Sequence, residues 1–308
     1  MTRVFIDGSA GTTGLRIRER LSERRDIDVI ALSEEKRKDT ASRREALNEC
    51  DIAFLCLPDA AAIEAVSLIE NGKTKVIDTS TAHRTAAGWA YGFPELKGFR
   101  EKIASSKRIA NPGCHASGFL ALVVPLVEEG ILSPDAQLTC FSLTGYSGGG
   151  KKMIAEYENE GRDPLLNAPR QYGIGQQHKH LKEMGAIARL STLPAFCPIV
   201  ADFYSGMEVT VPLFQKDIEE VRAVYRAWYN GAIVHYDEDA DEGGFLSAAA
   251  LSGRDDMQIL VTGNDERLLL TARFDNLGKG ASGAAIQNMN ILLGKNEAEG
   301  LTTGGKTI

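Results

Sequence analysis

The chain has 308 residues, and its 43% hydrophobic content is enough to bury one large core or two moderate ones. Lys and Arg number 35 against 42 Asp and Glu, giving a formal net charge of −7, which argues against nucleic acid or an anionic membrane as the main partner. No stretch approaches the roughly 20 apolar residues of a membrane span, and no signal peptide is predicted at the start. Five cysteines without a CxxC pair argue against a disulfide framework and favour a reduced, cytoplasmic chain.

The first predicted unit is a strand, a glycine-rich loop and a helix. Residues 3–6 are expected to form the strand, and apolar periodicity over 15–21 predicts an amphipathic helix. Such a unit cradles phosphate, because glycines admit the ligand and helix N–H groups face it. The spacing is G-x-x-G-x-x-G and not the usual G-x-G-x-x-G, so a turn that binds nothing is the alternative. The loop residues expected to bind a dinucleotide are Gly8, Ser9, Gly11, Thr12, Thr13 and Gly14.

A second strand is predicted at 28–32, and its end is where dinucleotide folds read the ribose 2′ position. An acidic side chain there would favour NAD, but Ser33 takes that place, and Lys36 and Arg37 follow one turn later. Two basic groups suit a 2′-phosphate, although the two intervening glutamates oppose it unless they face solvent. We therefore predict NADP as cofactor, with Ser33 and Arg37 at its 2′ end; a charged, solvated helix start is the alternative.

Further buried parallel strands are predicted at 51–58 and 75–78, with a helix between them. Open α/β sheets bind ligands at the carboxyl edge of their strands. Pro58 and Ser80, which lie at that edge, are therefore expected to contact the cofactor. Arg84 follows on the same side and could be a phosphate ligand or an ordinary surface charge.

A strong turn signal, Asn-Pro-Gly at 111–113, precedes Cys114 and the apolar run 116–124. The run predicts a buried helix, kinked or shortened at Pro125. Cys114 would then sit at the helix start, where N–H groups and the helix dipole favour a thiolate. We predict a nucleophilic cysteine; a small buried hydrophobe is the alternative. The other cysteines are expected in core strands (Cys56, Cys140), at the end of a polar segment (Cys50) and in a proline-flanked loop (Cys197).

The pattern changes after Ser133 to that of a mixed α+β domain. The expected strands are 138–143, 208–213, 232–236, 257–262 and 268–274, and the expected helices are 152–160 and 217–228. The last helix, 281–293, is rich in small residues and is expected to pack back on the first domain. The predicted fold is therefore α/β: a Rossmann-like, doubly wound nucleotide domain (1–112, joined by the C-terminal segment of about 281–308) and an α+β catalytic domain (113–280).

Two of the five histidines, His178 and His180, lie close together. A His-x-His pair can bind zinc, but no further ligands appear at useful spacing nearby, so no metal is predicted. If a helix starts near His180, Glu183 lies one turn on and would orient the imidazole as an acid/base partner of Cys114. A surface histidine pair is the alternative. The loop at 147–152 could approach an anionic substrate closely, although a flexible hairpin connection is as consistent with its glycines.

A dinucleotide fold, a helix-start cysteine and a poised histidine together suit redox chemistry at the acyl level. The thiolate attacks an activated acyl group, phosphate departs, and hydride from the nicotinamide reduces the thioester. Backbone N–H groups at Cys114 would stabilise the developing oxyanion.

Several motifs recur in the order found in one family, over nearly the whole chain. They are GSAGTTG (8–14), DTSTAHR (78–84), YGFPEL (91–96), NPGC (111–114), YSG (146–148), HKH (178–180) and DNLGKGA (275–281). With these motifs the chain resembles the N-acetyl-γ-glutamyl-phosphate reductases, closest to their short-form type. It departs from the longer forms at Lys182, where they often carry Pro, and at 81–83, where they have an acidic-aromatic pair.

The resemblance implies NADPH-dependent reduction of N-acetylglutamyl 5-phosphate to N-acetylglutamate 5-semialdehyde in arginine biosynthesis. It implies Cys114 as nucleophile, His180 as acid/base oriented by Glu183, and Asn276 near the nicotinamide. It also implies a dimerisation function for the second domain, and thus a homodimer or homotetramer. The residues expected to hold the acyl-phosphate substrate are Arg84, Ser147, Gly148 and His178.

Two alternatives remain open. An aspartate-semialdehyde dehydrogenase would share the fold and the cysteine chemistry but would need a carboxylate for the free ammonium of its substrate. An NADP-binding redox sensor would use the glycine loop without turnover.

Overall fold

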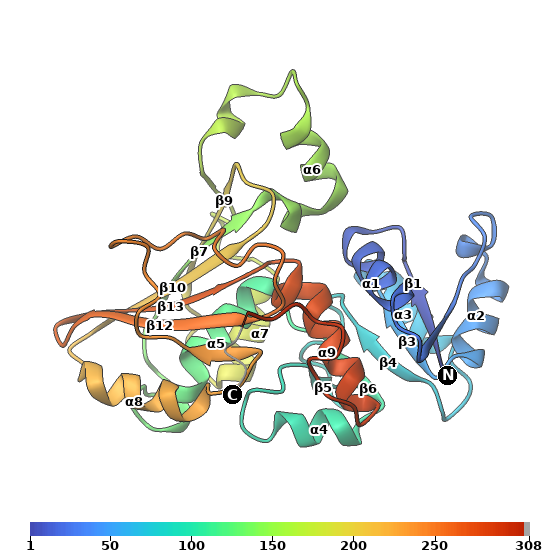
Figure 1. Ribbon diagram of the computed structural model, residues 1–308, viewed down its shortest axis with the longest axis horizontal. Helices are drawn as coiled ribbons and strands as arrows, with labels where there is room; N and C mark the ends of the chain where they lie inside the picture. The colour runs from blue at the N-terminus through green and yellow to red at the C-terminus, as the bar shows by residue number, and fades with distance from the viewer. Residues whose placement is uncertain (305–308) are drawn as a thin grey trace. The chain divides into compact units, whose positions relative to one another are not determined.

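The computed structural model describes residues 1–304, in two compact units (Figure 1). Unit 1 comprises Met1–Pro112 and Ala281–Leu301, and unit 2 comprises Gly113–Gly280 and residues 302–304. The last helix, α9 (Gly283–Leu292), contacts α1, α4 and β4 of unit 1 although it follows unit 2 in the chain.

Unit 1 is built on a six-stranded sheet in the order β2-β1-β3-β4-β6-β5, with every pairing parallel. Its strands are β1 (Thr2–Asp7), β2 (Ile27–Ile30), β3 (Ile52–Leu55), β4 (Lys75–Asp78), β5 (Ala90–Tyr91) and β6 (Arg108–Ala110). Its helices are α1 (Thr12–Ser22), α2 (Thr40–Glu49), α3 (Asp59–Ser67), α4 (Phe99–Ser105) and α9.

Helices cover both faces of this sheet, and the alternation of its strand residues shows why. Val4 and Ile6 of β1 pack with α1, α4 and α9, whereas Phe5 packs with α2 and α3. Both faces of each central strand are apolar and buried, which is the pattern of a parallel sheet with helices on both sides. The structure thus confirms the predicted doubly wound fold.

Unit 2 contains a mixed seven-stranded sheet in the order β11-β12-β13-β10-β7-β9-β8. Its strands are β7 (Thr139–Gly145), β8 (Arg170–Gln171), β9 (Ala195–Ala201), β10 (Met207–Phe214), β11 (Val234–Tyr236), β12 (Met257–Asn264) and β13 (Arg267–Phe274). Its helices are α5 (Cys114–Glu128), α6 (Gly150–Glu158), α7 (His180–Ala188) and α8 (Ile218–Trp228). The buried helix α5 packs on β10 and β13 and also contacts α7 and α8.

Helix α5 continues through Pro125 to Glu128, so of the two effects expected of this proline, a kink or a shortening, the shortening does not occur. One expectation for unit 2 is wrong. Cys197 lies in strand β9, paired with β7, and not in a loop. Pro198 has no N–H to donate, and its nitrogen lies on the edge of β9 that faces the short segment β8. On that edge the Pro198 carbonyl still accepts a hydrogen bond from Tyr172 N–H, so the strand accommodates the proline.

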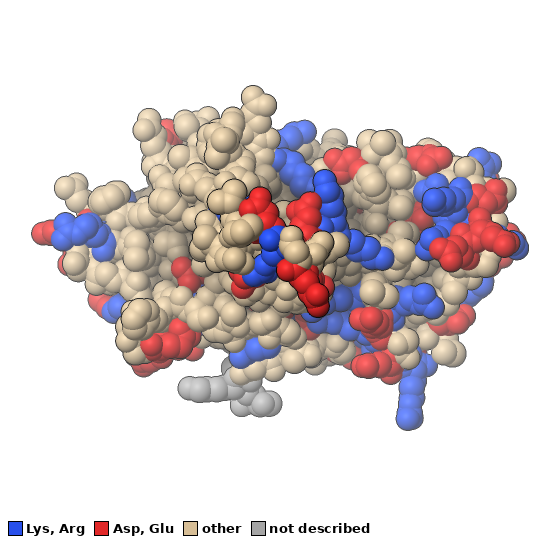
Figure 2. Space-filling model, turned by 90° about the horizontal axis from the view of Figure 1, so that it is seen from above, with Lys and Arg blue, Asp and Glu red and all other residues tan. Residues whose placement is uncertain are grey.

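The surface carries both signs of charge. On the face shown in Figure 2, Lys and Arg side chains lie intermixed with Asp and Glu, so their fields partly cancel there. Within residues 1–304, every helix is too short or too polar to cross a bilayer.

Candidate active site

Cys114 is the first residue of helix α5, and its side chain is half-buried. The N-cap position is Gly113, which offers no side chain to satisfy the N–H groups of the first turn. These groups and the helix dipole favour a negative charge at the sulfur. By contrast, burial raises the pKa of the Cys50 and Cys56 thiols to about 12, which makes them inert.

His180 begins helix α7, as predicted, and Glu183 lies on the same face. Glu183 Oε1 is 4.0 Å from His180 Nε2, and both side chains are buried. The other oxygen of the carboxylate, Oε2, accepts a hydrogen bond of 3.1 Å from the backbone N–H of Gly113. One acid therefore connects the imidazole with the residue that precedes the cysteine.

A buried imidazole that the sequence had not singled out lies next to Cys114. His115 Nδ1 is 2.6 Å from Ser142 Oγ, and its Nε2 is 2.7 Å from the Tyr172 hydroxyl. Burial, with a smaller contribution from His178, lowers the pKa of His115 to about 3, so this ring is neutral. Burial also raises the pKa of Tyr172, with a smaller contribution from the Cys114 thiol, so Tyr172 stays protonated.

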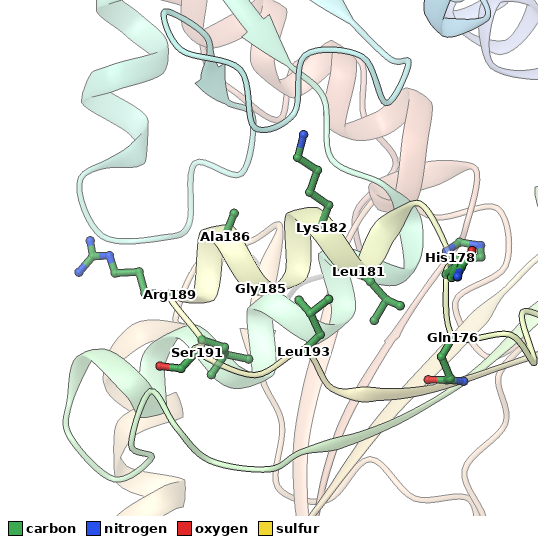
Figure 3. A pocket seen from close by; sticks show the side chains of 11 residues that line it. Gln176, His178, Leu181, Lys182, Gly185, Ala186, Arg189, Ser191 and Leu193 are labelled. Atoms are coloured by element: carbon green, nitrogen blue, oxygen red, sulfur yellow. The ribbon is translucent and has the colours of Figure 1, made fainter.

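His178 completes a cluster of three imidazoles. Its ring centroid lies 4.7 Å from that of His180 and 5.6 Å from that of His115. His178 also borders a cavity of about 690 Å³ along α7 (Figure 3). In this cavity Leu181 and Leu193 point toward one another, while Lys182 extends from the other side of the helix.

Ser147, Gly148 and Asn276 form a second group within unit 2. Asn276 Nδ2 donates to Ser147 Oγ at 3.0 Å, and its Oδ1 accepts from the N–H of Gly206 at 2.9 Å. A Cβ on Gly148 would lie 3.3 Å from that Asn276 amide nitrogen, so a glycine lets the two segments approach.

The glycine loop of unit 1 has the geometry of a phosphate cradle. Gly8 has φ +88°, and a Cβ there would lie 2.2 Å from the carbonyl oxygen of Cys56. A Cβ on Gly14 would lie 2.6 Å from Gly8 O, so Gly14 lets α1 pack closely on the loop. Thr12 Oγ1, at the N-terminus of α1, is buried and has no hydrogen-bond partner among the described residues. An anion at this helix start would supply one.

A cavity of about 500 Å³ lies over the loop. Five of the residues predicted to bind the cofactor line it: Gly8, Ser9, Gly11, Arg37 and Pro58. Arg18 and Lys38 also line it and were not predicted, although Arg18 follows Gly14 by one helical turn. Ser33 does not line it; its carbonyl accepts from the N–H groups of Lys36 and Arg37 and so shapes the turn that presents Arg37.

Ser80 and Arg84 lie at the carboxyl edge of the sheet but are held by other groups. Ser80 Oγ donates to Asp78, which also holds His83 Nδ1 at 2.6 Å. The Arg84 guanidinium is buried and donates to the backbone carbonyls of Asn111 and Thr79. These bonds hold the backbone that leads into the Pro112 turn. The sequence did not predict this structural role for Arg84.

Two family models match the chain, one for each unit. The NAD-binding domain of the semialdehyde dehydrogenases matches residues 3–106, and their dimerisation domain matches residues 114–276. Solved structures agree in fold: aspartate semialdehyde dehydrogenase II from Vibrio cholerae has a TM-score of 0.72 at 18% identity, covering 95% of this chain and 98% of that one. The enzyme from Candida albicans, solved with NADP, has a TM-score of 0.69 at 15% identity, covering 96% and 99%. Fold and site define an oxidoreductase of the semialdehyde dehydrogenase class.

Curated relatives resolve the family further. N-acetyl-gamma-glutamyl-phosphate reductase 2 of Nostoc sp. is 45% identical, covering 97% of this chain and 99% of that protein. The reductase of Mesorhizobium japonicum is 46% identical, covering 95% and 99%. The chain belongs to the N-acetyl-gamma-glutamyl-phosphate reductase family, which confirms the resemblance drawn from its motifs.

Proposed function

We propose that this protein reduces N-acetyl-L-glutamyl 5-phosphate to N-acetyl-L-glutamate 5-semialdehyde with NADPH, releasing phosphate, as a step of arginine biosynthesis. The observation that carries the proposal is Cys114 at the start of α5, with His180 and Glu183 in the same buried cluster. The names of the curated relatives support the choice of substrate.

In the first half-reaction Cys114 becomes acylated. His180 takes the thiol proton, and the sulfur attacks the acyl carbon of the substrate. The N–H groups of the first turn of α5 stabilise the oxyanion, and the carbon–oxygen bond to phosphate breaks. His180 returns its proton to the departing phosphate, while Glu183 keeps the imidazole in place.

In the second half-reaction the thioester is reduced. NADPH, when bound, supplies the hydride that adds to the thioester carbonyl carbon. The carbon–sulfur bond then breaks, the aldehyde leaves, and Cys114 returns as a thiolate, again stabilised by the start of α5. We assign Asn276, Ser147, Gly148, His178 and Arg84 to positioning of the nicotinamide or substrate, as the family resemblance implies.

Unit 1 is the proposed NADP-binding domain. The buried Thr12 hydroxyl and the exposed N–H groups at the start of α1 fit the pyrophosphate. Arg18, Arg37 and Lys38 supply positive charge for a 2′-phosphate in the 500 Å³ cavity. Arg43 lines it too, but its charge is matched by the buried Asp7 carboxylate at 3.0 Å, whereas the glutamate that pairs with Arg37, Glu34, is exposed to solvent.

We further propose that unit 2 assembles the protein into a homodimer or homotetramer, through the uncovered part of the sheet face opposite α5. Phe141 and Leu143 of β7 share that face with Ile199, Pro212 and Leu269, and Leu143 pairs with Ile199 as Pro212 pairs with Leu269. Phe141 is 45% and Leu269 is 44% exposed, and aromatic and aliphatic surface of this kind is typical of homodimer interfaces. Because the chemistry requires Cys114 as a thiol, we place the enzyme in a reducing compartment, the cytoplasm.

The decisive experiment measures phosphate-dependent reduction of NADP with N-acetylglutamate semialdehyde, and with aspartate semialdehyde for comparison. We expect activity with the acetylated substrate only. Cys114→Ser should abolish turnover and leave NADPH binding unchanged, and mass spectrometry of wild-type enzyme with acyl phosphate and no reductant should find an adduct on Cys114. Wild-type rates in the serine variant would exclude the thioester route.

A further inference from the structure

The fold brings three metal-ligating side chains together in unit 2. One ligand atom from each of Cys114, His115 and His180 lies within 4.8 Å of the other two. Both imidazoles are buried, and the thiol is half-buried. This set could not be predicted from spacing, because Cys114 and His115 lie more than 60 positions before His180 and no third ligand lies near His178 and His180 in the sequence.

The donor set is that of a zinc site. Zn²⁺ and Co²⁺ prefer sulfur and imidazole nitrogen as ligands, whereas Mg²⁺ and Ca²⁺ prefer oxygen. Tetrahedral coordination with ordinary bond lengths sets the ligand atoms about 3.5 Å apart. The side chains therefore need to approach by about an ångström when the ion binds.

A metal-bound imidazole needs an outer partner for its second nitrogen: His115 has Ser142 at 2.6 Å, and the nearest acid to His180 is Glu183 at 4.0 Å. Nδ1 of His115 already has an outer partner in the buried Ser142 hydroxyl, so Nε2, which now contacts the Tyr172 hydroxyl, is the nitrogen left for the ion. Ligation through Nε2 displaces that hydroxyl and keeps the 2.6 Å contact of Nδ1 with Ser142. For His180, Glu183 lies 4.0 Å from Nε2, which assigns Nδ1 to the ion.

We propose that Cys114, His115 and His180 form a chelating site for a thiophilic divalent cation of the Zn²⁺ type, with water in the fourth position. Binding makes one sulfur–metal and two nitrogen–metal bonds and releases the thiol proton to solvent. Because the metal takes the electron pair of the sulfur, the cation and the acyl group exclude one another at Cys114. Zinc bound at this site therefore inhibits the enzyme reversibly. The binding of zinc itself does not depend on which substrate the enzyme reduces.

Cobalt tests the binding without substrate or cofactor. Co²⁺ added to the metal-free full-length protein should give sulfur-to-cobalt charge-transfer absorption with one equivalent bound, and Zn²⁺ should displace it. Cys114→Ser should abolish the band. His115→Gln should weaken Zn²⁺ binding about tenfold or more, since even outer-partner losses cost that much. Cys197→Ser, in a thiol outside the cluster, is the matched control and should bind as wild type.

Tyr172→Phe separates chelation from binding by the thiol alone. It removes the hydroxyl that competes for His115 Nε2, so it should bind Zn²⁺ more tightly than wild type, by about tenfold for one lost hydrogen bond. Equal affinities in wild type, His115→Gln and Tyr172→Phe would overturn the site, as would a cobalt band that persists in Cys114→Ser. Failure of the proposed reduction with a normal cobalt titration would instead point to a different substrate.

Discussion

The backbone N–H of Gly113 donates a hydrogen bond to Glu183 Oε2, at 3.1 Å. The two residues are 70 positions apart in the sequence. Gly113 comes just before the proposed nucleophile Cys114, and Glu183 lies one helical turn after the proposed acid/base His180. The carboxylate therefore fixes the start of α5 relative to the start of α7. A general base must lie within hydrogen-bonding reach of its proton, so this tie sets the geometry on which acylation depends.

Replacing Glu183 with Gln should lower kcat while leaving the fold intact. The amide keeps an oxygen that can accept from Gly113 N–H, but it loses the charge that stabilises a protonated His180. We expect kcat to fall about ten- to a hundredfold, at the low end of what acid/base catalysis contributes. Steady-state kinetics and thermal unfolding on the same samples would check this.

Glu183→Ala is the comparison, because it removes both the charge and the acceptor. It should lower kcat further and also lower the midpoint of thermal unfolding, since the buried Gly113 N–H loses its partner. If Glu183→Gln instead keeps wild-type kcat, the carboxylate serves only the backbone of the Pro112 turn.

The positions of Cys114 and His180 were predictable because both residues begin helices that have local sequence signals. Asn-Pro-Gly before an apolar run places Cys114 at an N-terminus, and the i,i+3 spacing places Glu183 beside His180. Both signals are local, and the longer of them spans only residues 111–124. The doubly wound fold was predictable for a related reason: the central strands of unit 1 carry consecutive apolar residues, VFI in β1, IAFL in β3 and VI in β4.

The surroundings of the pair could not be predicted, because they depend on contacts between distant segments. Ser142 is 27 positions and Tyr172 is 57 positions from His115, and no local pattern joins them. Strand β9 was missed for the opposite reason, since Pro198 is a local signal against a strand. Its tertiary position beside the two-residue β8 removes the cost of the missing N–H.

Arg37→Ala should weaken NADPH much more than NADH. Arg37 lines the cavity of unit 1, and a charge-assisted hydrogen bond to phosphate is worth about 1.5–3 kcal/mol, or about ten- to a hundredfold in affinity. Fluorescence titration with each dinucleotide gives the two constants. Arg44→Ala is the matched control, because Arg44 is on the neighbouring α2, pairs with Glu70 and lies outside the cavity. Equal losses for both dinucleotides would show that Arg37 does not recognise the 2′-phosphate and would leave the cofactor preference undecided.

Phe141→Glu should shift the protein toward monomer. The side chain is 45% exposed on the uncovered sheet face of unit 2, so a charge there is tolerated by the folded chain but is costly to bury between subunits. Light scattering after size exclusion measures the mass. Leu15→Glu, with 42% exposure on α1 of unit 1, is the control and should leave the mass unchanged. An unchanged mass in Phe141→Glu would place the interface elsewhere.

The acid sensitivity of unit 1 should depend on Asp26. Its carboxylate receives two hydrogen bonds of 2.8 Å from Arg24 and contacts Lys295, which follows α9. Arg24 also donates to Asn290 Oδ1 in α9. The hydrogen bonds from Arg24 lower the pKa of Asp26, with a smaller contribution from Lys295 and despite the opposing effect of burial. This network therefore attaches the returning C-terminal helix to the start of β2.

The direction of the pH effect follows from that lowered pKa. The unfolded chain takes up the proton near pH 3.9, before the folded one does, so the stabilisation is complete above pH 3.9 and is lost as the pH falls toward the folded pKa. In Asp26→Asn we expect the free energy of unfolding to be about 1 kcal/mol lower at pH 7 and less dependent on pH between 5 and 3. Denaturant titrations at several pH values measure both, and Asp28→Asn, in an exposed neighbour 4.0 Å from Arg3, should match wild type. If the free energy of unfolding depends on pH in the same way in Asp26→Asn and in wild type, other carboxylates cause the loss of stability in acid.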